Sequence, residues 1–156
     1  MALKLSSAAF EHGAEIPTKY TCQGEDISPP LSWQGIPEAT RSLALIIHDP
    51  DVPSPDNPVR LWVHWVLYNL PVDTTSLAEH TTSSELPAGT VEGLNDWDRT
   101  GYGGPCPPMG RHRYFHKLYA LDLVLDDLHE PTKDQLEAAM QGHILAEAEL
   151  IGTYQK

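Results

Sequence analysis

Two acidic residues directly follow an apolar run of the chain. Asp49 and Asp51 come after residues 43–48, and the ring of Pro50 fixes the backbone between them. Residues at the end of a buried strand reach the rim of a sheet, where binding groups are frequent. Carboxylates at such a rim can accept hydrogen bonds or orient a histidine. The same pattern is also typical of an ordinary turn with two solvated acids.

A histidine stands inside the next apolar run, residues 62–70. In a strand, His64 would share one face with Trp62. A neutral imidazole needs one donor and one acceptor partner, and Asp49 would supply the acceptor and fix the tautomer. The alternative is a core histidine whose two nitrogens are both satisfied inside the protein.

A glycine- and proline-rich run, residues 101–110, precedes two further polar side chains. Its composition excludes helix and regular strand. Successive N–H groups of such a backbone can form a nest for an anion. His112 and Tyr114, on one face of the following strand, add further donors. Together the three segments predict a site for a phosphate or carboxylate group, with a plain connection between strands as the alternative.

Other chemistries receive less support from the residues. An Asp–His pair among Asp49, His64 and His112 could serve a hydrolase, but we recognise no nucleophile paired with a base. The same residues with Asp51 could bind a metal, yet the surplus of hydrogen-bond donors favours an anion. No nucleotide-binding or zinc-protease motif occurs. We therefore predict a binding protein rather than an enzyme, with no catalytic residues, no metal and no cofactor.

The composition narrows the range of partners. The formal net charge is −12, and the one basic cluster, residues 111–117, is too small for a nucleic-acid surface. No apolar run has membrane-spanning length. Cys22 and Cys106 lack the spacing of a zinc site, although they could form one disulfide. The first residues do not resemble a secretory signal, so we expect reduced thiols in the cytoplasm.

Hydrophobic patterning predicts a mostly β protein. We expect an antiparallel two-sheet β-sandwich with one or two peripheral helices, in one domain over residues 1–156. A helix should begin after the N-cap Thr132 and end at Gly142. Residues 1–40 should form short pieces and residues 71–89 a polar connection. The expected strands are residues 43–48, 62–70, 90–93 and 112–125, and a last strand from about residue 146.

Taken in order, these segments resemble the phosphatidylethanolamine-binding protein family. The chain is most similar to its short bacterial and archaeal branch, often described as Raf-kinase-inhibitor-like. Each motif alone is modest, but three in the family's order and spacing are specific, and the resemblance covers nearly the whole chain. The motifs are Asp49-Pro50-Asp51-Val52-Pro53, Trp62-Val63-His64-Trp65 and the segment from Gly104 to Tyr114, flanked by Ile27-Ser28-Pro29-Pro30-Leu31 and Leu150-Ile151-Gly152-Thr153-Tyr154.

The resemblance implies a two-sheet antiparallel sandwich with a small pocket at one rim. That pocket would hold phosphate, acetate or a phosphorylated head group, and the protein could modulate kinase-type signalling, dock on a kinase or protease as an inhibitor, or form a homodimer. The family also suggests a cis peptide at Arg60–Leu61. Two features differ from larger eukaryotic members: the segment at residues 109–111 is short, and no C-terminal helix follows the last strand. The implied pocket walls are Asp49, Asp51, Trp62, His64, Gly104, Pro105, His112 and Tyr114.

Overall fold

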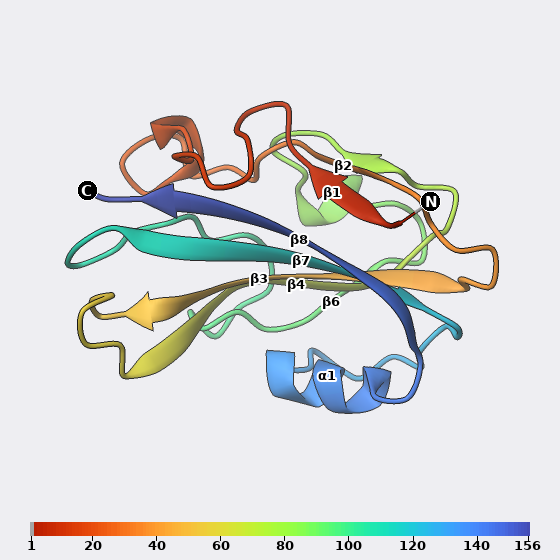
Figure 1. Cartoon of the computed structure of the whole chain (residues 1–156). Coiled ribbons are helices and arrows are strands. Elements are labelled where there is room, and N and C mark those ends of the chain that lie inside the picture. Colours follow the sequence, from red (N-terminus) through yellow and green to blue (C-terminus); the bar gives the residue numbers. More distant parts are fainter. Residues whose placement is uncertain (1) are drawn as a thin grey trace.

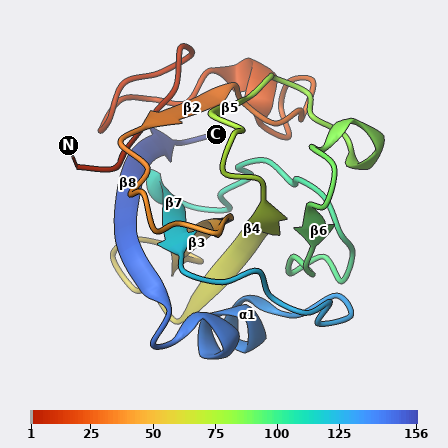
Figure 2. The same ribbon diagram turned by 90° about the vertical axis from the view of Figure 1, so that its right-hand side faces the viewer.

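Two antiparallel sheets and one helix make up the computed structural model, which describes residues 2–156. A five-stranded sheet has the order β6-β4-β3-β7-β8, and a three-stranded sheet, β1-β2-β5, lies over one of its faces (Figures 1 and 2). The predicted mostly β sandwich is thereby confirmed. The strands are β1 (Lys4–Ser6), β2 (Leu31–Gln34), β3 (Ser42–Val52), β4 (Arg60–Leu70), β5 (Ser76–Leu77), β6 (Val91–Glu92), β7 (His112–Leu121) and β8 (Ile144–Tyr154).

The large sheet buries apolar side chains on both faces. One face packs against the small sheet, where Trp33 meets Trp65 and Leu118 in the main core. The opposite face packs against the helix α1 (Lys133–Met140), which contributes Leu136 and Met140 (Figure 1). Because alternate residues of a strand point to opposite faces, strands buried on both sides are apolar throughout. This explains the continuous apolar runs of β3 and β4.

A register irregularity in β4 positions the site. Ile47 of β3 pairs with Trp65, whereas His48 pairs with Val63, so β4 holds one extra residue at this point. His64 and Trp65 therefore both face the small-sheet side of the large sheet, where their neighbours Tyr114 and Leu118 also lie. Such β-bulges re-aim a side chain and are frequent beside functional sites.

The predicted elements differ from the structure mainly at their ends. The helix is confirmed: Thr132 accepts a hydrogen bond from the Gln135 backbone N–H, and the helix ends at Met140, shortly before Gly142. β3 extends to Val52, so the two acids lie within a strand rather than after it, because pairing with β4 continues that far. β7 ends at Leu121 instead of residue 125. The polar connection contains β5 and a 3-10 helix, Ser83–Glu85, and a second one occurs at Thr18–Tyr20.

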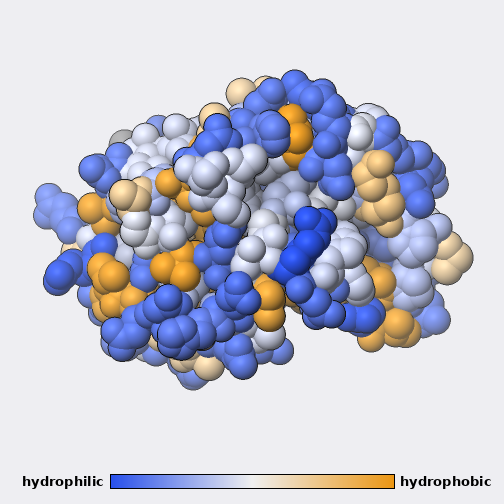
Figure 3. All heavy atoms as spheres, turned by 180° about the vertical axis from the view of Figure 1, so that it is seen from behind, coloured by the Kyte–Doolittle hydropathy of each residue, from blue (hydrophilic) through white to orange (hydrophobic). Residues whose placement is uncertain are grey.

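The surface carries no extended apolar area on the side opposite to that of Figure 1. There the surface is mostly hydrophilic, and its hydrophobic residues form separate small patches (Figure 3). Among the described residues, no helix is long and apolar enough to cross a membrane.

Candidate functional site

A cavity of about 350 Å³ lies at one end of the large sheet. We call it the site pocket. β3, β4 and β7 each contribute a polar side chain to its wall, and the loops at residues 94–100 and 104–108 close its sides. Several of the residues predicted from the sequence meet here. The lining residues are Asp49, Val52, Trp62, His64, Trp97, Cys106, Pro107, Pro108 and Tyr114.

One ring nitrogen of His64, which lines the site pocket, has no hydrogen-bond partner among the described residues. Its Nδ1 lies 2.7 Å from the carbonyl oxygen of Gly103, and a carbonyl can only accept, so Nδ1 carries the ring proton. Burial lowers the pKa of His64 to about 4, so the ring is neutral near pH 7 and Nε2 keeps its lone pair. The expectation that Asp49 orients His64 was wrong, because the Gly103 carbonyl fixes the tautomer instead.

Asp49 pairs with His112 rather than with His64. The Oδ2 atom of Asp49 lies 2.6 Å from Nδ1 of His112, and its Oδ1 accepts the backbone N–H of Asp51. The other ring nitrogen of His112, Nε2, faces the carbonyl oxygens of Met109 and Pro53 and must therefore donate. One proton is thus shared between Nδ1 and Oδ2, and the pair as a whole is uncharged in either arrangement. Burial raises the pKa of Asp49, which favours retention of that proton.

His112 itself does not reach the site pocket. Its side chain is fully buried and both ring nitrogens are bonded within the protein. It therefore supplies no free donor to a ligand, contrary to its predicted place in the wall. Its role in the structure is to hold the carboxylate of Asp49, which does line the pocket.

Tyr114 offers an unpaired hydroxyl. Its side chain is buried, and within residues 2–156 the hydroxyl has no hydrogen-bond partner. Burial and the nearby charge of Asp49 raise the pKa of Tyr114, so the phenol keeps its proton. A buried polar atom without a partner costs free energy, and it is the kind of group that a bound ligand satisfies.

Asp51 lies next to Asp49 in sequence but has a different environment. Arg113 binds its carboxylate through Nε and Nη2 at 3.0 and 2.9 Å, and the backbone N–H of Arg113 donates to the same group. These hydrogen bonds with Arg113 lower the pKa of Asp51 against the opposing effect of burial. Asp51 therefore ties β3 to β7 and does not line the site pocket.

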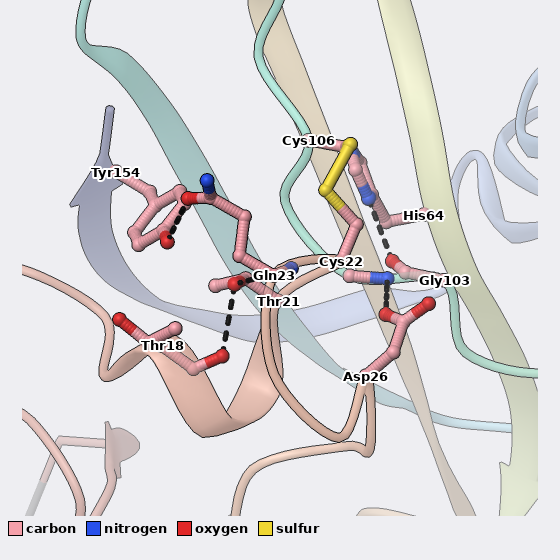
Figure 4. Close-up of a disulfide and its surroundings, with 10 residues drawn as sticks. Thr18, Thr21, Cys22, Gln23, Asp26, His64, Gly103, Cys106 and Tyr154 are labelled. Atoms are coloured by element: carbon pink, nitrogen blue, oxygen red, sulfur yellow. Dashed lines mark hydrogen bonds between the residues drawn. A yellow bond between two sulfur atoms is a disulfide. The ribbon is translucent and has the colours of Figure 1, made fainter. Parts of the chain in front are cut away.

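Two N–H groups of the glycine-rich loop, the predicted nest for an anion, are bonded inside the protein. The Gly103 N–H donates to the His64 carbonyl. The next N–H, that of Gly104, donates to Oδ1 of Asp26, which lies beside the loop in Figure 4. Prolines follow at positions 105, 107 and 108 and have no N–H to offer. Gly104 and Pro105, both predicted to line the pocket, are buried and are not among its lining residues. The loop residues that line the pocket are Cys106, Pro107 and Pro108, of which Cys106 alone has a backbone N–H.

A disulfide joins Cys22 to Cys106 across 84 positions of the chain (Figure 4). The expectation of reduced thiols was therefore wrong. With two cysteines only this pairing was possible, but sequence could not show that it forms, because it requires the docking of residues 18–26 against the glycine-rich loop. Hydrogen bonds accompany this docking: the Cys22 N–H donates to the Pro105 carbonyl, and the Tyr102 hydroxyl to the Tyr20 carbonyl.

The sequence interpretation missed Trp97, which forms one side of the site pocket. Its ring lies edge-on to both His64 and Trp62, with centroid distances of 5.1 and 5.5 Å. Buried Asn95 holds the loop that carries it: Asn95 Oδ1 accepts the Trp97 N–H, and Nδ2 donates to the Gly101 carbonyl. A tryptophan between acidic residues at a loop tip was the only available signal, and it is a weak one.

Two further expectations concern backbone and metal. The cis peptide bond is Val52–Pro53, and Arg60–Leu61, the predicted candidate, is not among the cis bonds of the described chain. Within residues 2–156 no cluster of three or more His, Cys, Asp or Glu side chains has the geometry of a metal site.

Known proteins resemble the chain over its whole length. The family model for phosphatidylethanolamine-binding protein matches residues 6–155. The UPF0098 protein of Methanothermobacter thermautotrophicus is 50% identical over 99% of both chains. Among solved structures, a phosphatidylethanolamine-binding protein homolog from Chlamydia trachomatis is 49% identical with a TM-score of 0.89, covering 99% of this chain and 98% of that chain.

A more distant structure gives the same result. YbcL of E. coli, described as a new member of the mammalian PEBP family, is 29% identical with a TM-score of 0.90, covering 100% of this chain and 99% of that one. Sequence motifs, fold and relatives therefore agree: the chain belongs to the phosphatidylethanolamine-binding protein family.

Proposed function

We propose that this protein binds a small anionic ligand through a protonated acid group, with a phosphate monoester as the best-fitting class. One observation carries the proposal. His64 and Tyr114 both line the same apolar cavity. Within residues 2–156, His64 Nε2 is an acceptor and the buried Tyr114 hydroxyl a donor without a hydrogen-bond partner. A monoprotonated phosphate matches this pair, because its P–OH donates and its other oxygens accept.

The proton of the ligand is what distinguishes this proposal from simple charge attraction. His64 is neutral and the Asp49–His112 pair has no net charge, so the site pocket offers no free cation to a fully ionised group. Asp49 retains acceptor capacity and can take a second hydrogen bond from the ligand. A donor-free anion would place its oxygens against the lone pairs of His64 and Asp49, which is unfavourable.

Two alkyl anions of equal charge test this account. Ethyl phosphate at pH 5.5 and ethyl sulfate both carry one negative charge there, but only the phosphate carries an acidic proton. We expect calorimetry to show at least about tenfold tighter binding of ethyl phosphate, since an acceptor left facing an acceptor costs about 1–3 kcal/mol. The affinity should fall as the pH rises above about 6, where a phosphate monoester loses its second proton.

Variants of the two key groups sharpen the test. Tyr114→Phe removes the donor and His64→Gln changes the acceptor, and each should weaken ethyl phosphate binding about tenfold. Equal affinities for ethyl phosphate and ethyl sulfate would overturn the proposal. Binding to vesicles that contain phosphatidic acid, a monoester lipid, would indicate that the phosphate group belongs to a lipid rather than to a free small molecule. Vesicles of phosphatidylethanolamine test a diester head group.

The alternatives have less support. A hydrolase using Asp49, His64 and His112 would need an accessible proton-transfer pair, but His112 is enclosed. Docking on a kinase or protease, homodimer formation and avoidance of nucleic acid stay predictions. Cytoplasmic location also stays a prediction, and the Cys22–Cys106 disulfide argues against it, because such bonds are typical of oxidising compartments.

A further inference from the structure

Two arginines lie on the tryptophans of the site pocket. The guanidinium carbon of Arg60 is 4.6 Å from the ring centre of Trp62, and that of Arg99 is 5.9 Å from the ring centre of Trp97. The two indole rings contact each other edge to face. The four side chains thus form one continuous row, with an exposed cation at each end.

Among the described residues, neither of these two cations is paired with a carboxylate, in contrast to the two arginines that flank His112. Arg111 is paired with Glu15, and Arg113 with Asp51. Within the described chain, residues 2–156, neither Arg60 nor Arg99 has a salt-bridge partner. Carboxylates are abundant in a protein with a formal net charge of −12, yet these two guanidinium groups, stacked on tryptophans that line one pocket, are both unpaired in the part of the chain that the structure describes.

The acids that surround Arg60 form no salt bridge with it within residues 2–156. Arg60 shares a neighbouring depression with Asp96, Asp98 and Asp134. The Oδ2 atom of Asp96 already accepts the Val63 backbone N–H, and Oδ1 of Asp134 lies 4.0 Å from Nζ of Lys133. Arg99 is held in place by its backbone, since its carbonyl accepts the Asn95 N–H and its N–H donates to Asn95 Oδ1. The backbone of Arg60 lies in β4 and that of Arg99 is hydrogen-bonded to Asn95, while neither guanidinium group has a salt-bridge partner within the described residues.

We propose that Arg60 and Arg99 form a second subsite at the mouth of the pocket, which binds a second anionic group of the same ligand. This inference rests on the proposed function of the inner site. The ligand class is then a small phosphate monoester with an acidic group at the far end of an apolar spacer. The spacer would lie against the indole rings of Trp62 and Trp97, and guanidinium groups are well suited to carboxylate or phosphate.

A matched pair of alkyl phosphates tests the second subsite separately from the first. Butyl phosphate has the spacer alone, whereas 3-carboxypropyl phosphate ends in a carboxylate. Calorimetry at pH 5.5 and low salt should give roughly tenfold tighter binding of the carboxylate compound, and added NaCl should reduce that ratio because the cations are exposed. 3-Aminopropyl phosphate, whose far end is cationic, should bind more weakly than butyl phosphate.

For each variant, the quantity measured is the affinity for 3-carboxypropyl phosphate divided by the affinity for butyl phosphate. Arg60→Gln and Arg99→Gln should each reduce the ratio, and the double variant should bring it close to one. Arg41→Gln is the matched control and should keep the wild-type ratio, since Arg41 donates its backbone N–H to the Leu121 carbonyl, away from the pocket lining. A wild-type ratio near one with tight butyl phosphate binding would overturn the second subsite alone. Absence of binding by both compounds would overturn the inner site as well.

Discussion

The site pocket and a larger groove on the same molecule differ in the polar groups that line them. The groove, of about 740 Å³, runs between β1 and β8, and we call it the β1–β8 groove. Its polar lining residues, such as Lys4, Gln34 and Glu149, are exposed to water. The site pocket has about half that volume, yet Asp49, His64 and Tyr114 are all buried in its wall.

This difference shows that volume alone does not identify a binding site. Exposed polar groups satisfy their hydrogen bonds with water, so a ligand gains little by replacing it. Buried groups have already lost their hydrogen bonds to water, and the Tyr114 hydroxyl has no hydrogen bond within the described residues to replace them. Binding energy is therefore available at the smaller cavity. The following predictions test whether this contrast holds.

Low pH should produce the largest loss of stability, and the loss should come from buried histidines rather than from the β1–β8 groove. His64, its neighbour His116 and His48 all have pKa values lowered by burial to about 4, so the unfolded chain binds more protons than the folded chain below about pH 6.5. Stability should be complete above pH 6.5 and fall by up to about 3 kcal/mol per histidine as the pH approaches 4. Urea unfolding followed by tryptophan fluorescence at several pH values measures this loss.

Variants assign the acid effect to particular residues. His64→Gln and His116→Gln should each make the loss of stability with falling pH less steep. Glu149→Gln, in the β1–β8 groove, should follow the wild type. Asp49, whose pKa is raised by burial, acts in the opposite direction and partly offsets the histidines. If Glu149→Gln changed the dependence of stability on pH as much as His64→Gln, the two regions would not differ in the way proposed.

Reduction of the disulfide should have the next largest effect. The bond closes a long loop, because Cys22 and Cys106 have a sequence separation of 84, so its removal should lower the free energy of unfolding by about 2–5 kcal/mol. Because Cys106 lines the site pocket, ethyl phosphate binding should weaken too. Urea unfolding and calorimetry with and without a thiol reductant provide the measurements.

The paired variant Cys22→Ala/Cys106→Ala serves as the control for reduction. It should match the reduced wild type in both measurements, and the reductant should leave it unchanged. A reduced protein that shows two free thiols but keeps its full stability and affinity would mean that the hydrogen bonds around Pro105 and Tyr20 hold the loop without the disulfide.

Gly103→Ala should produce the smallest of the three effects. A Cβ at this position would lie 2.2 Å from a carbon of the Trp97 ring, so the ring or the loop must shift. Overpacking of this kind costs about 1–3 kcal/mol of stability, and the displaced ring should also weaken ethyl phosphate binding. Thermal unfolding and calorimetry measure the two consequences.

A second substitution tests the cause. Combining Gly103→Ala with Trp97→Leu removes the ring that the new methyl group would strike. The loss of stability in the double variant should therefore be smaller than the sum of the losses in the two single variants. Fully additive changes would show that the methyl group acts through the backbone and not through Trp97.

Much of the fold followed from the sequence, while the partners within the site did not. Alternating and continuous apolar runs identified the long strands, and the Thr132 cap identified the helix. The same reasoning brought Asp49, Trp62, His64 and Tyr114 to one place, where they line one cavity. Hydrogen-bond partners depend on distances between segments far apart in the chain, which a pattern of residue types does not specify.

The sequence by itself determined that this chain is a β-sandwich of its family, because hydrophobic periodicity and three ordered motifs are local properties. Only the tertiary structure decided what each site residue does. A bulge in β4 aims His64 into the cavity, the Gly103 carbonyl fixes its proton, and His112 rather than His64 binds Asp49. These outcomes follow from packing and burial, which set the free donors and acceptors of a site only once the whole chain has folded.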